Sequence, residues 1–188
     1  MVQASELPIQ TNASAMDMAN EVFGAGVNVV SANYSGDNRS SGIYSDGDAI
    51  SPEVTPGDTG VMLSTGRLRD FTNSWGDANH SSNTSSNTRG VNNDSDFNAL
   101  AGTRTYDASI LEVDFIPDSD TLTLQFVFSS DEYPEYSGTL YTDIVGVWVN
   151  GSVVDLAVGN GNVAVGNVND INNENLYVDN TGSQYNTE

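Results

Sequence analysis

The chain of 188 residues carries 26 acidic and 5 basic side chains, which gives a formal net charge of −21 at pH 7. Nucleic acids and anionic membrane surfaces are bound by clustered Lys and Arg, so this balance excludes a nucleic acid partner and argues against a membrane-surface protein. The chain has no Cys and one His, which excludes disulfides and zinc sites built from several His or Cys ligands, and its apolar runs fall far short of the ~20 residues of a membrane span.

One short helix is predicted near the N-terminus. Thr11, Asn12 or Ser14 can cap its start, and the glycines at 24 and 26 would end it. The apolar side chains between these limits recur at helical spacing, namely Met16, Ala19, Val22 and Phe23.

Short strands are predicted for most of the remaining chain. Apolar and polar residues alternate at 111–115 and, most regularly, at 121–128, so residues 118–120 are expected to form a hairpin turn between two paired strands. Asn150 and Gly151 separate two further apolar runs, and this dipeptide favours a two-residue hairpin. The other predicted strands cover residues 27–34, 61–63, 144–149 (a central strand), 153–156, 163–165 and 176–178.

Many short strands separated by Gly, Asn and Asp predict an all-β fold, a β-sandwich with one short N-terminal helix and long Asn/Ser/Asp-rich loops. We expect a single ligand-binding domain over residues 1–188. Residues 73–96 form the longest loop, and a loop of this length is either a binding loop or poorly ordered. The first residues show no signal peptide, and we interpret the chain as a piece of a longer protein.

The sequence offers little for catalysis. His80, the only histidine, lies in the long loop without a G-x-S-x-G nucleophile motif elsewhere, so we interpret it as an exposed loop residue. The aspartate pairs at 46/48, 94/96 and 118/120 are more typical of Asx turns than of calcium loops, because the Gly and Glu of an EF-hand are missing.

The most informative segment is residues 129–138. Carboxylates and aromatic rings are interleaved in it: Asp131, Glu132, Tyr133, Glu135 and Tyr136, followed shortly by Asp143. Carboxylates this close repel one another unless a cation or hydrogen bonds compensate. Because the chain is rich in oxygen ligands and poor in His and Cys, Ca²⁺ is the ion that the composition favours, and a solvated acidic turn is the alternative.

The segment 126–136, together with 143–146, resembles the choice-of-anchor L domains of bacterial surface proteins. Three further stretches, at 60–66, 100–108 and 111–115, resemble the same family. Within this family, the chain is similar to the peptide-binding domains of giant, calcium-dependent RTX adhesins. Members of the family usually continue past the position of Glu188 into another strand pair and acidic motif, so either the chain is short or part of the sheet and site lies outside it.

The resemblance implies a non-enzymatic, calcium-binding module, monomeric within a long adhesin, that is extracellular on the bacterial cell surface and serves cell adhesion and biofilms. Its implied partners are the C-terminal peptides of proteins on other cells, whose terminal carboxylate would contact a bound Ca²⁺. The implied metal ligands are Asp131, Glu132, Glu135, Asp143 and Asp107. The implied peptide-binding residues are Tyr133, Tyr136, Gly138, Ser64, Thr65 and Gly66.

Three other functions compete with this one. A calcium-dependent carbohydrate-binding (lectin-like) module would chelate sugar hydroxyls through the ion and stack tyrosines on a sugar face. A glycoside hydrolase would need Glu132 and Glu135 on either side of a bond, which a separation of three residues on one loop disfavours. A structural spacer would use calcium only for stiffness and would give the tyrosines no role.

Overall fold

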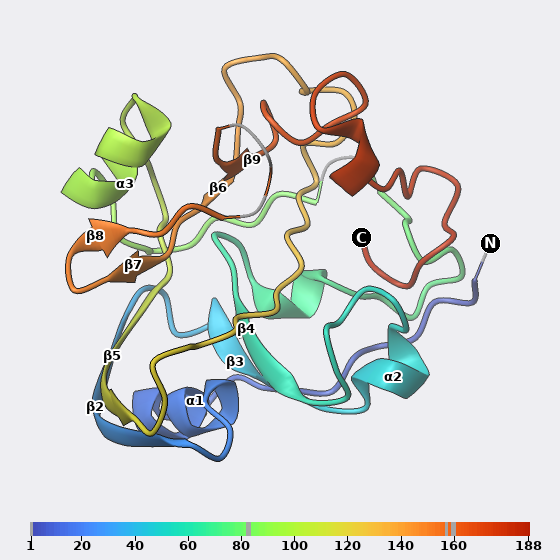
Figure 1. The fold of residues 1–188 in the computed structure, drawn as a ribbon. Helices are drawn as coiled ribbons and strands as arrows, with labels where there is room; N and C mark the ends of the chain where they lie inside the picture. Colours follow the sequence, from blue (N-terminus) through green and yellow to red (C-terminus); the bar gives the residue numbers. More distant parts are fainter. Residues whose placement is uncertain (1, 82–83, 157, 159–160) are drawn as a thin grey trace.

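A computed structural model describes residues 2–81, 84–156, 158 and 161–188. Strands predominate over helices in this part of the chain, which agrees with a mainly β fold (Figure 1). The strands form one three-stranded sheet and three two-stranded pairs. These pairings fit a small all-β fold without defining the two facing sheets of a sandwich.

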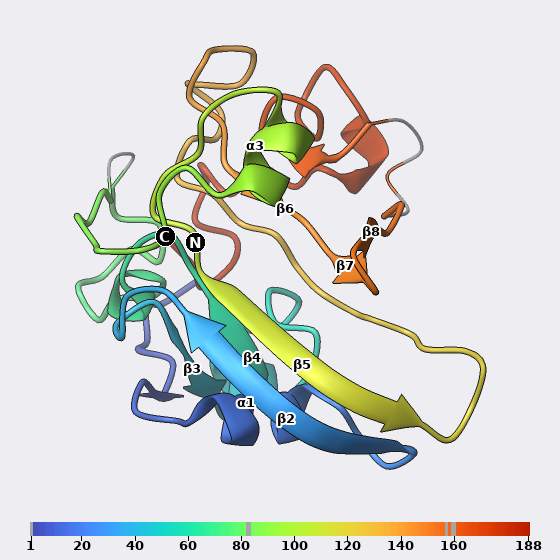
Figure 2. The same cartoon turned by 90° about the vertical axis from the view of Figure 1, so that its left-hand side faces the viewer.

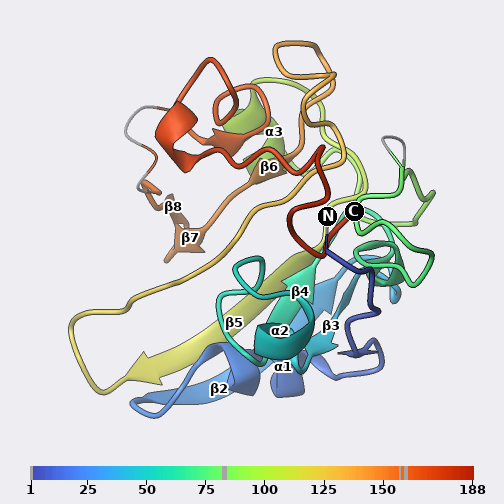
Figure 3. The same ribbon diagram turned by 90° about the vertical axis from the view of Figure 1, so that its right-hand side faces the viewer.

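The three-stranded sheet has the antiparallel order β1 (Ile9–Gln10), β3 (Ser41–Tyr44), β4 (Gly60–Leu63). β4 is the strand predicted at 61–63. Gly42 permits the close approach of β1 and β3, because a Cβ there would lie 2.8 Å from the carbonyl oxygen of Gln10. The short helix α2 (Gly47–Ile50) follows β3 and lies beside this sheet (Figure 3).

The longest pairing joins β2 (Val27–Ser35) to β5 (Ile110–Pro117). The two strands run antiparallel from Val27 opposite Pro117 to Ser35 opposite Ile110, with a bulge between Val29 and Ser31. Figure 2 shows them as a long twisted ribbon. Both strands were predicted, but their pairing was not, because some 75 residues separate them in the sequence.

Helix α1 (Ala15–Val22) confirms the predicted N-terminal helix and its cap. The Ser14 hydroxyl accepts the Asp17 N–H at 3.1 Å, and the Asp17 carboxylate accepts the Ser14 N–H at 3.0 Å, which is a complete capping box. The buried side chains are Met18 and Ala19, so the apolar face is rotated from the predicted one. α1 packs against β2 and β4.

Two predictions for the middle of the chain are wrong. Residues 121–128 form no strand, and the exposed side chains of Leu122 and Leu124 lie on an extended segment that leaves the end of β5 and runs back through the molecule (Figures 1 and 2). The hairpin at 118–120 is absent, because the Asp118 N–H bonds to the Gly26 carbonyl oxygen at 2.8 Å and thus closes the β2–β5 ribbon. A period-two pattern specifies two faces but no pairing partner.

The expectation of one helix is also wrong, since α2 and α3 (Ser95–Ala101) are helical. Asp94 starts α3: its carboxylate accepts the N–H groups of Asp96 and Phe97, both at 3.0 Å. The Asx turn predicted here is therefore the N-cap of a helix. Two short 3₁₀ helices, η1 (Leu68–Asp70) and η2 (Glu174–Leu176), complete the helical elements, and the strand predicted at 176–178 does not form.

The apolar run 144–149 forms two short strands instead of one central strand. β6 (Ile144–Val145) pairs with β9 (Val163–Ala164), and β7 (Trp148–Val149) pairs with β8 (Ser152–Val153). Asn150 and Gly151 have φ of +50° and +75°, as the predicted two-residue hairpin requires. Beside β9, Val158, Val163 and Val168 form a buried cluster onto which Phe128, Val145, Leu156 and Tyr177 pack.

The long loop at 73–96 is anchored by polar side chains where the structure describes it. Asn73 and Thr88 are buried, and the Asn73 amide donates to the Ala78 carbonyl oxygen at 3.0 Å. His80 is exposed, as expected. Near this loop, the two ends of the chain lie side by side (Figure 3), since the Val2 N–H bonds to the Ser183 carbonyl oxygen at 2.8 Å.

Candidate functional site

The acidic segment 131–138 is a series of tight turns between the extended segment 121–128 and β6. The Tyr136 N–H bonds to the Glu132 carbonyl oxygen at 3.0 Å, and the Ser137 N–H bonds to the Pro134 carbonyl oxygen at 3.2 Å. Gly138 has φ of +82°, a left-handed conformation that side chains disfavour. We call residues 129–143 the acidic loop.

Hydrogen bonds hold two of the predicted metal ligands. The Ser130 hydroxyl donates to the Asp143 carboxylate at 2.7 Å and accepts the Glu132 N–H at 3.2 Å. The Asp131 carboxylate accepts the N–H of Thr84, which belongs to the long loop. Asp143 is thus held by a residue of the acidic loop itself, and Asp131 is held by a residue of the long loop.

Burial and mutual repulsion disfavour the ionised forms of two carboxylates. Burial raises the pKa of Asp131, and the nearby charges of Glu188, Glu135 and Asp143 raise it further against the lowering effect of the Thr84 N–H. Burial also raises the pKa of Glu132, with the charges of Asp143 and Asp131 adding to it. These carboxylates therefore lie within electrostatic reach of one another in partly desolvated surroundings.

The two tyrosines of the acidic loop have different surroundings. The Tyr133 hydroxyl donates to the Val168 carbonyl oxygen, and its ring lies 5.1 Å from the Tyr177 ring, centroid to centroid. Burial raises the pKa of Tyr133 to about 12. Tyr136 is exposed and meets Tyr141 edge to face at 5.4 Å between ring centroids. Tyr133 therefore anchors the loop, whereas Tyr136 is available to a ligand.

Residues 64–66, which the resemblance implied as peptide-binding, form a short turn that is connected to the acidic loop through residues 84–88. The Thr88 hydroxyl donates to the Thr65 carbonyl oxygen at 2.7 Å, and the Arg67 N–H bonds to the Ser86 hydroxyl at 2.8 Å. Within the turn, the Gly66 N–H bonds to the Ser64 hydroxyl at 2.9 Å. Since Thr84 contacts Asp131, the long loop joins both predicted site segments.

Asp107 lies elsewhere in the network. It directly precedes Ala108 of the isolated Val91–Ala108 bridge, has φ of +53°, and its N–H bonds to the Asn92 side-chain oxygen at 3.0 Å. Within the described residues, no hydrogen bond or ion pair joins Asp107 to the acidic loop. Of the five predicted metal ligands, Asp131, Glu132, Glu135 and Asp143 thus lie in one loop, where Asp131 is within electrostatic reach of the other loop carboxylates Glu135 and Asp143, and Glu132 of Asp143 and Asp131.

The acidic loop fits calcium in its donor chemistry, since carboxylate, hydroxyl and carbonyl oxygens are the ligands that this ion takes. Its geometry fits only in part. Across residues 2–81, 84–156, 158 and 161–188, no three Asp, Glu, His or Cys side chains converge closely enough to hold a metal ion. Any ion at this loop would need a closer approach of Asp131, Glu132 and Asp143, or oxygens from outside the carboxylate set.

Two residues near the site were not predicted. Thr84 supplies the N–H that Asp131 accepts, and no local pattern reveals a partner 47 positions away. Glu188 adds a further negative charge near Asp131. Its carboxylate accepts the Asn73 amide at 2.5 Å and the N–H groups of His80 and Ser81 at 2.9 and 3.2 Å.

Comparison with protein families gives one match, in which the model of the choice-of-anchor L domain covers residues 6–188. No curated protein and no solved structure matches the chain. Among the described residues, no helix has the length and apolar character needed to cross a membrane.

Proposed function

Because the chain belongs to the choice-of-anchor L domain family, we propose that it is a calcium-dependent, peptide-binding module of a bacterial surface adhesin. The family consists of surface-associated adhesion modules and is not a family of enzymes. The ligand that we propose is the C-terminal carboxylate of a protein on another cell. The RTX-type architecture, the role in biofilms and the monomeric state within a long adhesin belong to the same proposal.

The observation that carries the proposal is the half-buried cluster of like charges in the acidic loop. Asp131 and Glu132 are partly buried near Asp143; burial raises the pKa of both, and repulsion from the neighbouring carboxylates raises it further. Within the described residues, Arg39 forms a salt bridge with Asp37, and no Arg forms one with the carboxylates of this cluster. A divalent cation would remove the repulsion and supply a ligand position with positive charge.

The net charge of −21 explains why a cation would be needed for this ligand. A protein of this charge repels an anionic peptide terminus at a distance. Asp131, Glu132, Glu135 and Asp143 would hold the ion, and Tyr136 would contact the side chain that precedes the terminal carboxylate. The turn 64–66 would lie on the far side of residues 84–88.

A calorimetric titration with short peptides tests the proposal. A peptide with a free C-terminal carboxylate should bind in millimolar Ca²⁺ and should lose binding in excess chelator. The same peptide with an amidated C-terminus should not bind under either condition. Equal affinity of the free and amidated peptides would refute carboxylate recognition.

A lectin-like function is the second candidate, and the exposed pair Tyr136 and Tyr141 favours it. The two rings meet edge to face at 5.4 Å, and both are accessible for stacking on a sugar. A glycan array tests this candidate. Calcium-dependent binding to the array would support it over peptide binding if simple sugars compete for that binding and peptides do not.

A further inference from the structure

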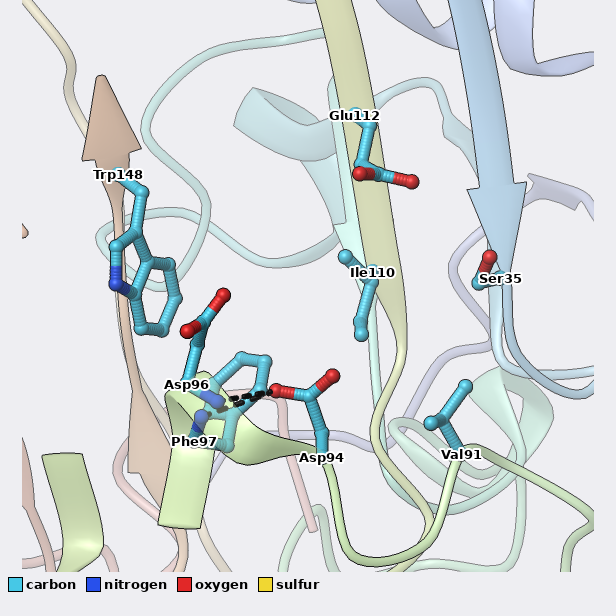
Figure 4. A pocket seen from close by; sticks show the side chains of 8 residues that line it. All are labelled: Ser35, Val91, Asp94, Asp96, Phe97, Ile110, Glu112 and Trp148. Atoms are coloured by element: carbon cyan, nitrogen blue, oxygen red, sulfur yellow. Dashed lines mark hydrogen bonds between the residues drawn. The ribbon is translucent and has the colours of Figure 1, made fainter. Parts of the chain in front are cut away.

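A cavity lies where α3, the β2–β5 ribbon and β7 meet (Figure 4). Its volume is about 220 Å³, which is below the roughly 300–1,000 Å³ of pockets that enclose a whole small molecule. It shares no lining residue with the acidic loop. The space therefore suits a single side chain or a small group of atoms at a separate place on the molecule.

The polar lining is acidic. Asp94, Asp96 and Glu112 line the cavity, and no Arg or His does. Asp94 is engaged as the N-cap of α3, and Glu112 accepts the Asn33 side-chain amide at 3.2 Å. The Asp96 carboxylate accepts no hydrogen bond from the described residues. One carboxylate is thus fixed, one is held on β5, and one is available to a ligand.

The remaining walls are aromatic and aliphatic. Trp148 and Phe97 meet edge to face with 5.0 Å between ring centroids and 74° between ring planes. A Cβ at Gly146 would overlap the Trp148 indole, so the glycine allows the ring its position. Figure 4 shows Trp148 and Asp96 on one side of the cavity and Glu112 with Ile110 on the other.

This combination selects against a metal ion. A metal needs several oxygens on one point, whereas the carboxylates of this cavity share its lining with the aromatic side chains of Phe97 and Trp148 and the aliphatic side chain of Ile110. Carboxylates that line a cavity together with an indole ring instead match a larger cation with distributed charge. The ring face attracts such a cation, and the carboxylates accept its N–H groups.

We propose that the cavity lined by Asp96, Glu112 and Trp148 binds an organic cation, the guanidinium or alkylammonium group of a basic side chain or of a small molecule. The protein's charge of −21 attracts such ligands toward the surface. The proposal goes beyond the calcium-dependent function and does not depend on it, because the two sites share no residue.

Fluorescence of Trp148 tests the proposal directly. The chain has two Trp residues, and the variant Trp75→Phe leaves Trp148 as the only one; Trp75 is 79% exposed and lies outside this cavity. N-acetylarginine amide and N-acetyllysine amide should change the emission saturably. N-acetylcitrulline amide, which is neutral and has nearly the shape of the arginine probe, should not.

Two variants assign the binding to the cavity. Asp96→Asn and Glu112→Gln keep the shape of the side chains and should each weaken arginine amide binding about tenfold, as the loss of a charged hydrogen bond implies. Asp118→Asn removes the same charge outside the cavity and should leave the affinity unchanged. Saturable binding of the citrulline probe, or equal affinity of all three variants, would overturn the proposal.

A second probe distinguishes a cation on a polypeptide side chain from a free small cation. A capped Gly-Gly-Arg-Gly-Gly peptide that binds about tenfold tighter than arginine amide would identify a polypeptide side chain as the ligand. Equal affinities would identify a free small cation. Absence of binding by both probes, with the circular dichroism of the protein intact, would refute the site.

Discussion

The Ser130 hydroxyl donates a hydrogen bond of 2.7 Å to the Asp143 carboxylate, thirteen residues further along the chain. This bond ties the start of the acidic loop to the residue that precedes β6. It holds Asp143 next to Asp131 and Glu132 although the charges repel. The hydrogen bond therefore keeps Asp143 from moving away from the carboxylates that repel it.

Asp143→Asn should abolish stabilisation by calcium without weakening the calcium-free protein. Asparagine keeps an oxygen that can accept the Ser130 hydrogen bond and removes one repelling charge, so the variant in chelator should melt at or above the wild-type temperature. Wild type at a calcium concentration 100 times its Kd should gain about 2.7 kcal/mol. Scanning calorimetry of Asp120→Asn, an exposed control, should show the wild-type gain, and an equal gain in Asp143→Asn would exclude this residue as a ligand.

The raised pKa values of Asp131 and Glu132 predict a pH-dependent penalty in the absence of calcium. A carboxylate with a folded-state pKa above the unfolded value favours folding below the usual range of about 4, and this contribution is lost as the pH rises through the folded pKa. The double variant Asp131→Asn/Glu132→Gln should therefore be more stable than wild type at pH 7. This advantage should shrink toward pH 4 in urea titrations, and an advantage that does not change with pH would contradict the repulsion.

The ionised carboxylate of Asp37 should stabilise the fold at neutral pH, in contrast to the carboxylates of Asp131 and Glu132. Its carboxylate accepts two hydrogen bonds from the Arg39 guanidinium, at 2.8 and 2.6 Å, and the Arg89 N–H at 2.8 Å. These bonds to Arg39 lower the pKa of Asp37, so its contribution is present above the usual aspartate range and is lost only in strong acid. Asp37→Asn should be less stable than wild type at pH 7, and urea titrations should show the two curves converging below pH 3. A difference in the free energy of unfolding that stays the same at every pH would assign the effect of Asp37→Asn to packing.

The sequence predicted those parts of the structure that depend on local chemistry. The Ser14 cap, the strands around 27–34 and 111–115, and the turn at Asn150 and Gly151 all follow from neighbouring residues. The partner of β5 and the unpaired state of 121–128 could not be predicted, because a strand's alternation does not specify what it pairs with. In the site, the density of charge identified the acidic loop, whereas the bond from Thr84 to Asp131 depends on how a distant loop folds back.

Tyr133→Phe should destabilise the protein by about 1–2 kcal/mol. The variant removes the hydroxyl that donates to the Val168 carbonyl oxygen and keeps the ring against Tyr177. For a domain of this size, the melting temperature should fall by about 2–8 °C. Tyr141→Phe is the matched control, since Tyr141 is 65% exposed and its hydroxyl makes no hydrogen bond within the described residues. A melting temperature for Tyr133→Phe equal to that of the control would mean that the hydroxyl does not anchor the loop.

Gly138→Ala should disturb the acidic loop through the backbone alone. A Cβ at Gly138 would meet no atom within 4 Å, so there is room for the methyl group, but φ of +82° is a conformation that alanine disfavours by about 1 kcal/mol. Gly57→Ala is the control, because φ there is not in the left-handed range and a Cβ would lie an ordinary 3.7 Å from the Thr59 carbonyl oxygen. Scanning calorimetry should show a lower melting temperature for Gly138→Ala only. Since the turn at Gly138 leads into Asp143, its calcium affinity should fall as well, and an unchanged affinity would separate this turn from the site.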